Sequence, residues 1–202
     1  HFDVPLLGGD TIAAPIRTFG LTAFGEAAPP VPDRRGARAG DALWVSGTIG
    51  DAGLGLKIAK GEIEGPRRLL KAYRLPMPRL AEGQALAAHV NAMADVSDGL
   101  LIDAARIAQA SSLAVAIDLA AIPRSAEAIA IAGDDRAARL AAATAGDDYA
   151  LVFASASSPE TIAALAPAAV RVGTFSAGAG LTLTEAGDDV ALPGRLGWLH
   201  NN

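Results

Sequence analysis

The sequence predicts an α/β (α+β) fold in which a mixed sheet packs against helices. Short apolar runs rich in β-branched residues, typical of buried strands, alternate along the chain with alanine-rich stretches typical of helices. This alternation favours a layered mixture of sheet and helices. Hydrophobic residues make up 51% of the 202 residues and charged residues 19%, so the chain can bury a sizeable core.

The first part of the chain contains a predicted strand and a predicted boundary. Residues 15–26 (PIRTFGLTAFGE) alternate as a strand would, and the proline- and glycine-rich stretch 29–41 predicts a loop. We therefore divide the chain into residues 1–28 and residues 29–202. The apolar run 42–47 (ALWVSG) then predicts a buried strand, followed by a glycine-rich turn that leads into a helix.

The remaining elements follow from the same two patterns. Helices are predicted over 65–75 and 81–94, with the prolines of LPMPR between them. A short strand end, a turn at Ser97-Asp98-Gly99 and a helix to about Ala110 come next. The further predictions are strands at LAVAIDL, ALVFAS, VRVGTF and LTLTE, with helices over 124–144 and 159–166.

Composition excludes several classes of function. The net charge is −5 and no block of Lys or Arg is present, which argues against nucleic-acid binding. The absence of cysteine excludes disulfides, a thiolate nucleophile and Cys-ligated zinc, and three scattered histidines do not form a zinc pattern. No apolar run approaches the ~20 residues that span a bilayer. We expect a cytoplasmic enzyme that acts on small molecules.

Chemistry-bearing residues collect in four turns: GGDT (8–11), SGTIGDAGLG (46–55), DVSDG (95–99) and AGDDY (145–149). Mg²⁺ prefers oxygen ligands and completes its shell with nucleotide phosphates, which suits Asp10, Asp95 and Asp98. The glycines of the second turn could let backbone N–H groups face phosphate oxygens at a helix N-terminus. The second turn lacks the Gly-Lys-Ser/Thr ending of a Walker A loop.

Each of these turns also has a structural explanation that stays open. GGDT is most often an ordinary turn, and Asp98 or Ser97 could be a helix N-cap. The pair at 147–148 could be a solvated turn. Trp44 is expected in the core, and Trp198 could pin the tail there. The two arginines at 34–35 could be loop charges, and His89 a packed or surface histidine.

Taken together in order, the stretches LLGGDT, RRGARAGDALWVSGTIGDAGLGL, PRLAEGQALA, MADVSDGLLIDAARIAQAS, AGDDYALVF and GWLH resemble the thiamine-monophosphate kinases. These enzymes belong to a superfamily with aminoimidazole ribonucleotide synthetase, selenophosphate synthetase and the hydrogenase maturation protein HypE. The similar stretches run through nearly the whole chain.

The resemblance implies roles for particular residues. ATP, the co-substrate, would be bound by Gly9, Asp10, Arg34 and Ser97, although Arg35 makes the choice of arginine uncertain by one position. Several Mg²⁺ ions would be held by Asp10, Asp95 and Asp98. Thiamine monophosphate would contact Asp147 and Trp198. Asp147 stands where the family carries a glutamate, and the shorter side chain leaves that contact open.

The resemblance also implies an activity and an organisation. The family passes the γ-phosphate of ATP directly to the phosphate of thiamine monophosphate, giving thiamine diphosphate. Residues 1–28 would be the end of the N-terminal ATP-binding domain and residues 29–202 the synthetase-like C-terminal domain. We expect the chain to be N-terminally truncated relative to the family, inactive alone and a homodimer at full length. A superfamily sibling with another acceptor and an inactive C-terminal module are the alternatives.

Overall fold

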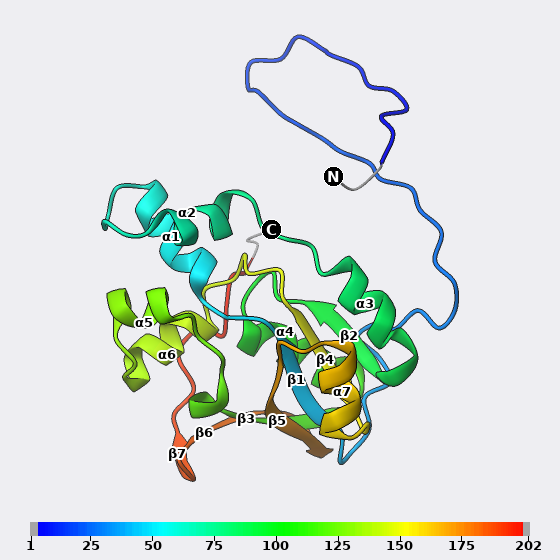
Figure 1. Cartoon of the computed structure of the whole chain (residues 1–202), viewed down its shortest axis with the longest axis vertical. Coiled ribbons are helices and arrows are strands. Elements are labelled where there is room, and N and C mark those ends of the chain that lie inside the picture. The colour runs from blue at the N-terminus through cyan, green and yellow to red at the C-terminus, as the bar shows by residue number, and fades with distance from the viewer. Residues whose placement is uncertain (1–3, 200–202) are drawn as a thin grey trace.

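A seven-stranded sheet organises the computed structural model, which describes residues 4–199 (Figure 1). The strand order is β2-β4-β1-β5-β3-β6-β7, and every neighbouring pair is antiparallel except β3 and β6. This arrangement confirms the predicted mixed sheet. The strands are β1 (Ala42–Ser46), β2 (Ala92–Asp95), β3 (Leu113–Asp118), β4 (Leu151–Ser155), β5 (Ala169–Ala177), β6 (Gly180–Glu185) and β7 (Asp188–Val190).

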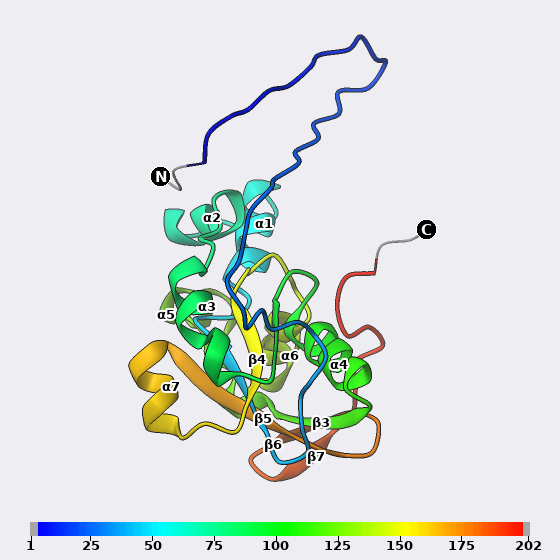
Figure 2. The same cartoon turned by 90° about the vertical axis from the view of Figure 1, so that its right-hand side faces the viewer.

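Helices cover both faces of this sheet, as Figures 1 and 2 show from perpendicular directions. On one face α4 packs through a buried apolar side that includes Leu101, Ala104 and Ile107. Among residues 4–199 no helix has the length and apolar character needed to cross a membrane. The α-helices are α1 (Asp51–Ala59), α2 (Arg67–Arg74), α3 (Leu80–Leu86), α4 (Leu100–Ala110), α5 (Ala126–Ala132), α6 (Arg136–Ala143) and α7 (Pro159–Leu165), and short 3-10 turns cover Ala87–His89 and Leu119–Ala121.

Strand β1 shows why its first four residues, Ala42 to Val45, are apolar. Its side chains alternate between faces, so Leu43 and Val45 enter the larger core while Trp44 enters a second cluster on the opposite face. Trp44 stacks on Phe153 of the neighbouring strand, with ring centroids 6.5 Å apart. A strand buried on both faces needs a continuous apolar run, and the prediction for residues 42–47 is confirmed.

Two sequence predictions of secondary structure are wrong. The expected helix over 81–94 ends with α3 and the 3-10 turn, and its last residues form β2, hydrogen-bonded to β4. Long-range pairing with β4 overrides the helix propensity of alanine here. The strand expected over 15–26 does not form, because a strand needs a hydrogen-bonded neighbour and none of the described residues pairs with this segment.

The N-terminal segment extends away from the domain in both views (Figures 1 and 2). Its apolar side chains face solvent, and Phe19 for example is 94% exposed. The segment returns to the domain near residue 26, where residues 26–32 lie over the sheet side that carries α3. The division at residues 28 and 29 stays a prediction.

Candidate functional site

One edge of the sheet brings together three of the four turns. Strands β1 and β2 end at this edge, and β4, antiparallel to both, begins there. Asp95 at the end of β2 pairs in register with Leu151, whose backbone N–H also donates to the Ser46 hydroxyl at 3.0 Å. The turns after β1, after β2 and before β4 are therefore neighbours in space.

The turn before β4 is fastened to the turn after β2. The N–H groups of Asp147 and Tyr149 donate to the carbonyls of Ser97 and Val96, each at 2.9 Å. Gly146 has φ +81°, and a Cβ at this position would lie 2.6 Å from the Ser97 oxygen. Glycine is therefore required both for the left-handed backbone and for this close approach.

A buried carboxylate organises the Ser97-Asp98-Gly99 turn. Asp103, fully buried in α4, accepts the N–H groups of Ser97 and Asp98, each at 3.1 Å. Arg106 donates to Asp103 at 2.8 Å and to Asp98 at 2.5 Å. Burial raises the pKa of Asp103, while the Asp98 N–H and Arg106 oppose that rise. Gly99 occupies the N-cap position of α4, which corrects the alternative that Ser97 or Asp98 does.

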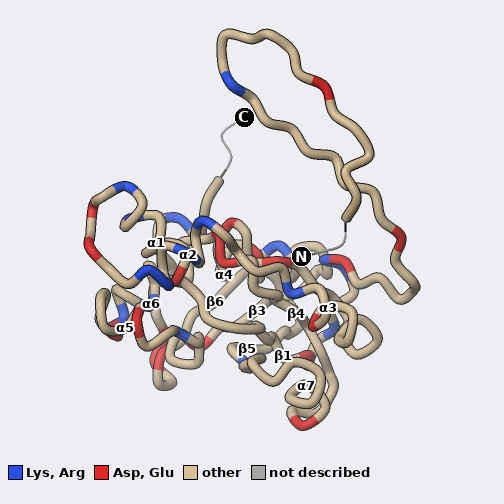
Figure 3. Tube along the Cα trace, turned by 45° about the horizontal axis from the view of Figure 1, so that its top comes forward, with Lys and Arg blue, Asp and Glu red and all other residues tan. Residues whose placement is uncertain are grey.

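Three aspartates at this edge act electrostatically on Tyr149. Its pKa is raised first by burial and then by the negative charges of Asp147, Asp95 and Asp98. The three carboxylates therefore lie close enough to act on one phenol. Figure 3 shows acidic segments gathered beside α4 at this end of the sheet, with basic segments near them.

Arg34 joins this edge, whereas Arg35 does not. A guanidinium nitrogen of Arg34 lies 4.0 Å from the Asp95 carboxylate. Arg35 instead pairs with Asp33 at 2.7 Å, and that pair is exposed. The geometry therefore favours Arg34 as the arginine that faces the site.

Asp148 links the site to the glycine-rich turn before α1. Its two carboxylate oxygens accept the N–H groups of Gly50 at 2.7 Å and Ala52 at 3.1 Å. Burial raises the pKa of Asp148 to about 7 against the effect of these two bonds, and Asp51 and Asp147 add to the rise. Asp148 is therefore not part of a solvated turn.

These contacts correct the expectation for the glycine-rich turn. We expected its N–H groups to face phosphate oxygens, but those of Gly50 and Ala52 already donate to Asp148. Those of Gly47 and Ile49 donate to the carbonyls of Ala168 and Pro123. Four amides of the turn are thus used inside the protein.

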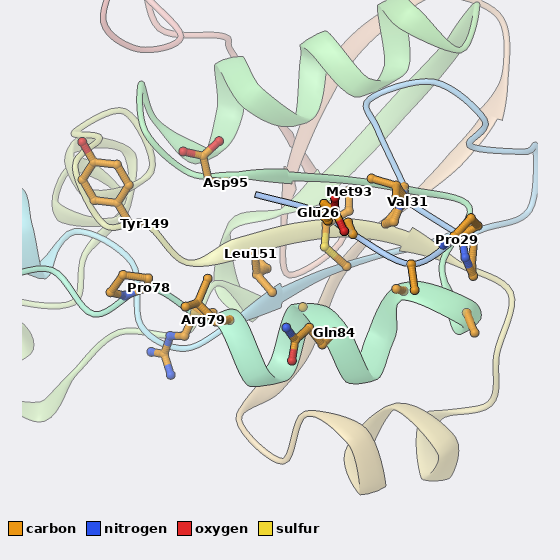
Figure 4. Close-up of a pocket in the computed structure, with 18 of the residues that line it drawn as sticks. Glu26, Pro29, Val31, Pro78, Arg79, Gln84, Met93, Asp95, Tyr149 and Leu151 are labelled. Atoms are coloured by element: carbon orange, nitrogen blue, oxygen red, sulfur yellow. The ribbon is translucent and has the colours of Figure 1, made fainter. Parts of the chain in front are cut away.

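A cavity of about 950 Å³ opens beside the acidic edge. Figure 4 shows Asp95 and Tyr149 at one end and Pro29 and Val31 toward the other. The floor includes Met93 and Leu151 of the sheet, one wall belongs to α3, and the prolines of residues 29–32 complete the lining. A largely apolar chamber with the Asp95 carboxylate and the Tyr149 hydroxyl at one end suits a ligand that has an apolar body and a polar tip.

The structure does not bring Gly9 and Asp10 to this edge. Both are exposed in the N-terminal segment, and the Asp10 carboxylate accepts its neighbour Thr11 N–H at 2.7 Å. Within residues 4–199 no three acidic or histidine side chains form a group that could hold a metal. Asp95 and Asp98 have the carboxylate oxygens that Mg²⁺ prefers, and the Asp98 carboxylate also accepts from Arg106. Their role as Mg²⁺ ligands stays a prediction.

The two tryptophans have opposite environments. Trp44 is 6% exposed, which confirms its core assignment, whereas Trp198 is 62% exposed and does not pin the tail in the core. The backbone N–H of Trp198 donates to the Asp98 carbonyl at 2.8 Å. The backbone of Trp198 is therefore attached to the Asp98 turn, while its side chain is exposed. His200, which closes the GWLH motif, lies outside the described residues.

Sequence reasoning missed Asp103, Arg106 and Tyr149 and gave Asp148 no role. A signal was available for Asp103, because a carboxylate inside the apolar run LLIDAARIA is expected to be buried and partnered. No comparable signal marks Asp148, whose partners Gly50 and Ala52 lie 98 and 96 residues away in the chain.

Comparison with known proteins gives a consistent set of relatives. Residues 38–185 match the family model described as AIR synthase related protein, C-terminal domain. A thiamine-monophosphate kinase of Caulobacter vibrioides is 40% identical over 98% of this chain and 59% of its own length. The Escherichia coli K12 protein of that name is 37% identical over 62% of this chain and 40% of its own length.

Solved structures agree with these sequence matches. Thiamine-monophosphate kinase from Stenotrophomonas maltophilia superposes with a TM-score of 0.69 at 32% identity, covering 79% of this chain and 54% of that one. A structure of AaThiL complexed with AMPPCP and TMP gives a TM-score of 0.71 at 29% identity, covering 84% and 54%. The chain thus spans 59% or less of the length of each of these four proteins.

Proposed function

The chain belongs to the AIR synthase related proteins, whose C-terminal domain occupies residues 38–185, and from that membership we propose that it is part of a thiamine-monophosphate kinase. The proposed reaction transfers the γ-phosphate of ATP to the phosphate of thiamine monophosphate, giving thiamine diphosphate and ADP. The observation that carries the proposal is the bonding of the turn that holds Asp147 to the turn that holds Asp95 and Asp98, through the Asp147 and Tyr149 N–H groups. Relatives with the kinase name, one of them similar over 98% of this chain, support it.

The residues at the edge suit direct phosphoryl transfer. This reaction requires alignment of two phosphates and neutralisation of their charge, with little covalent participation by the protein. Asp95 and Asp98 would hold Mg²⁺, which when bound neutralises phosphate charge. Asp103 fixes the backbone of this turn by accepting the Ser97 and Asp98 N–H groups. Arg34, near Asp95, can offer its guanidinium to an ATP phosphate.

Substrate contacts are proposed on both sides of the acidic edge. Trp198 would stack on the cationic thiamine, which an exposed indole face favours. Asp147 would bind the same substrate, and Ser97 would contact ATP. The cavity beside Asp95 and Tyr149 has room for an apolar part of either ligand.

Completion of the site would involve residues 1–28, which we propose to be the end of an ATP-binding domain. Gly9 and Asp10 would then reach the nucleotide and Mg²⁺ when this segment packs against the rest of that domain or against a second subunit. The exposed apolar side chains of the segment, Phe19 among them, support such packing and a homodimeric assembly. We propose a cytoplasmic location, in keeping with small-molecule substrates.

The test is thiamine diphosphate formation from thiamine monophosphate, ATP and Mg²⁺, with the parent protein that contains this sequence and with this chain alongside. We expect product from the parent and none from the chain alone. A folded parent that binds ATP but forms no thiamine diphosphate would exclude this activity. Protection of each protein by Mg-ATP against thermal unfolding shows separately whether the nucleotide site is present.

A further inference from the structure

We propose that Asp148 is a positioning residue, which clamps the acidic turn 145–149 to the N-terminus of α1 and thereby places Asp147 for substrate binding. The clamp itself is read from the contacts of this chain, while its effect on the substrate rests on the proposed function. Asp148 would act through its neighbour and would not itself touch the reacting phosphates.

The clamp uses both oxygens of one carboxylate. One oxygen accepts the Gly50 N–H at 2.7 Å and the other accepts the Ala52 N–H at 3.1 Å. A carboxylate that accepts two backbone N–H groups at a helix N-terminus is held in a single orientation, because the donors have fixed positions and the helix dipole favours its charge.

The anchor point on α1 cannot move freely. Gly50 has φ +90°, and a Cβ there would lie 2.5 Å from the Ala142 Cβ, so its backbone is pressed against α6. Gly53, one turn on, packs against Ala145, the first residue of the acidic turn, and a Cβ on Gly53 would lie 2.5 Å from the Ala145 Cβ. The start of α1 is therefore packed closely against both α6 and the turn that Asp148 holds.

The turn that Asp148 holds contains two residues in an unfavourable backbone conformation. Asp147 and Tyr149, on either side of it, have φ values of +61° and +50°. Left-handed conformations of residues other than glycine are unfavourable and persist where their surroundings enforce them. Backbone bonds to Val96 and Ser97 hold one side of this turn. Asp148 holds the other side.

A residue that only capped the start of α1 would not need a carboxylate. A serine or threonine hydroxyl at a helix N-terminus gives comparable stabilisation without a buried charge. Asp148 instead places a carboxylate near Asp51 and Asp147, where like charges oppose it. The arrangement gives the turn a two-point attachment that a hydroxyl does not provide, and this favours a role in positioning.

The first experiment compares Asp148→Asn with wild type in the full-length parent enzyme. Asn keeps the shape but has one acceptor oxygen, so one N–H loses its partner and the turn loosens. We expect KM for thiamine monophosphate to rise about tenfold, the equivalent of one lost hydrogen bond, with KM for ATP changed less than about twofold. Asp135→Asn is the matched control, because Asp135 accepts the Ala138 N–H at 2.8 Å at the start of α6. It should change neither KM.

The second experiment measures the clamp without the reaction. Hydrogen–deuterium exchange of residues 145–149 and of the start of α1 should quicken in Asp148→Asn and stay unchanged in Asp135→Asn. If the parent makes no thiamine diphosphate, the proposed function fails, and exchange still decides whether the clamp exists. If Asp148→Asn does not fold, Asp148→Ser takes its place in this experiment, because serine is smaller and retains one acceptor.

Two results would overturn the proposal. Unchanged exchange in both segments would show that Asp148 does not hold the turn. Equal increases in KM for thiamine monophosphate and for ATP would show a general structural role with no particular effect on Asp147.

Discussion

The carboxylate of Asp103 lies 3.1 Å from the backbone nitrogen of Asp98 and accepts its N–H from a fully buried position inside α4. A carboxylate in the first turn of a helix thus fixes the backbone of Asp98, a partly buried aspartate five residues earlier. Arg106 completes the arrangement by donating to both acids. The proposed metal ligand is therefore held by a buried polar network whose members come from one helix and the turn before it.

The first prediction concerns Asp103→Asn in the parent enzyme. One oxygen of Asp103 accepts both N–H groups and the other accepts the Arg106 guanidinium, so Asn, with one oxygen, can keep only one of these two sides and the Asp98 turn should loosen. Loss of a supporting partner of a metal ligand typically weakens metal binding or activity about 10–100-fold. We expect the Mg²⁺ concentration for half-maximal activity to rise at least about tenfold. A Mg²⁺ titration of thiamine diphosphate formation measures this.

The control for that titration is Asp118→Asn. Asp118, the last residue of β3, accepts the Ala120 N–H at 2.9 Å. This is also a bond from a backbone N–H to an aspartate, but no proposed ligand lies beside it. Asp118→Asn should leave the Mg²⁺ requirement unchanged. An unaltered requirement in a folded Asp103→Asn enzyme would contradict the supporting role.

The second prediction uses the two adjacent arginines as a matched pair. Arg34 lies 4.0 Å from the Asp95 carboxylate, while Arg35 forms an exposed pair with Asp33. Arg34→Ala should raise KM for ATP about tenfold, in the range of a lost charge-assisted hydrogen bond. Arg35→Ala should leave KM for ATP unchanged, since exposed pairs contribute little. The reverse outcome in steady-state kinetics would move the nucleotide contact to Arg35.

The third prediction is a pH dependence of stability from Asp148. Burial raises its pKa to about 7 in the folded protein, above the ordinary aspartate value of about 4 in the unfolded chain. The folded protein therefore retains the proton where the unfolded chain has lost it. The resulting stabilisation is complete below about pH 4 and is lost as the pH rises to about 7.

Denaturant unfolding at several pH values between 4 and 8 measures this contribution. The free energy of unfolding of the wild type, relative to that of Asp148→Asn, should fall as the pH rises through this window. The comparison with the variant removes the slopes of the other carboxylates. Parallel pH profiles for the two proteins would show that Asp148 has an ordinary pKa.

Local patterns predicted most of the fold because most elements carry their own signal. The strand predicted at 42–47 begins with four apolar residues because both its faces are buried, and the helix to Ala110 follows a clear turn. Residues 92–95 carried no such signal, because alanine favours a helix and the pairing with β4 lies more than 50 residues away in the chain. The segment 15–26 is the opposite case: it has the alternating pattern of a strand, but none of the described residues pairs with it and no strand forms.

The sequence predicted which residues belong to the candidate site better than it predicted the hydrogen bonds that join its turns. Asp95, Asp98 and Asp147 stood out because they lie in short turns between elements, and the structure brings them to one edge. The bonds that hold these turns, from Asp148 to Gly50 or from Asp147 to Ser97, join distant parts of the chain. No local pattern contains that information, and the roles of Gly9 and Asp10 stay predictions.

The last prediction is that replacing Trp44 lowers stability, whereas replacing Trp198 weakens substrate binding. Trp44 is buried and stacked on Phe153, so Trp44→Ala should lower the free energy of unfolding by about 3–5 kcal/mol. Trp198 is exposed beside the Asp98 turn, so Trp198→Ala should leave the melting temperature unchanged. It should instead raise KM for thiamine monophosphate about tenfold, as loss of a partly desolvated cation–π contact would. Trp198→Phe should restore much of the affinity, because a phenyl face can also stack on a cationic ring. Thermal melts and steady-state kinetics of the full-length variants measure both effects, and a Trp198→Ala enzyme with normal KM would remove this residue from the substrate site.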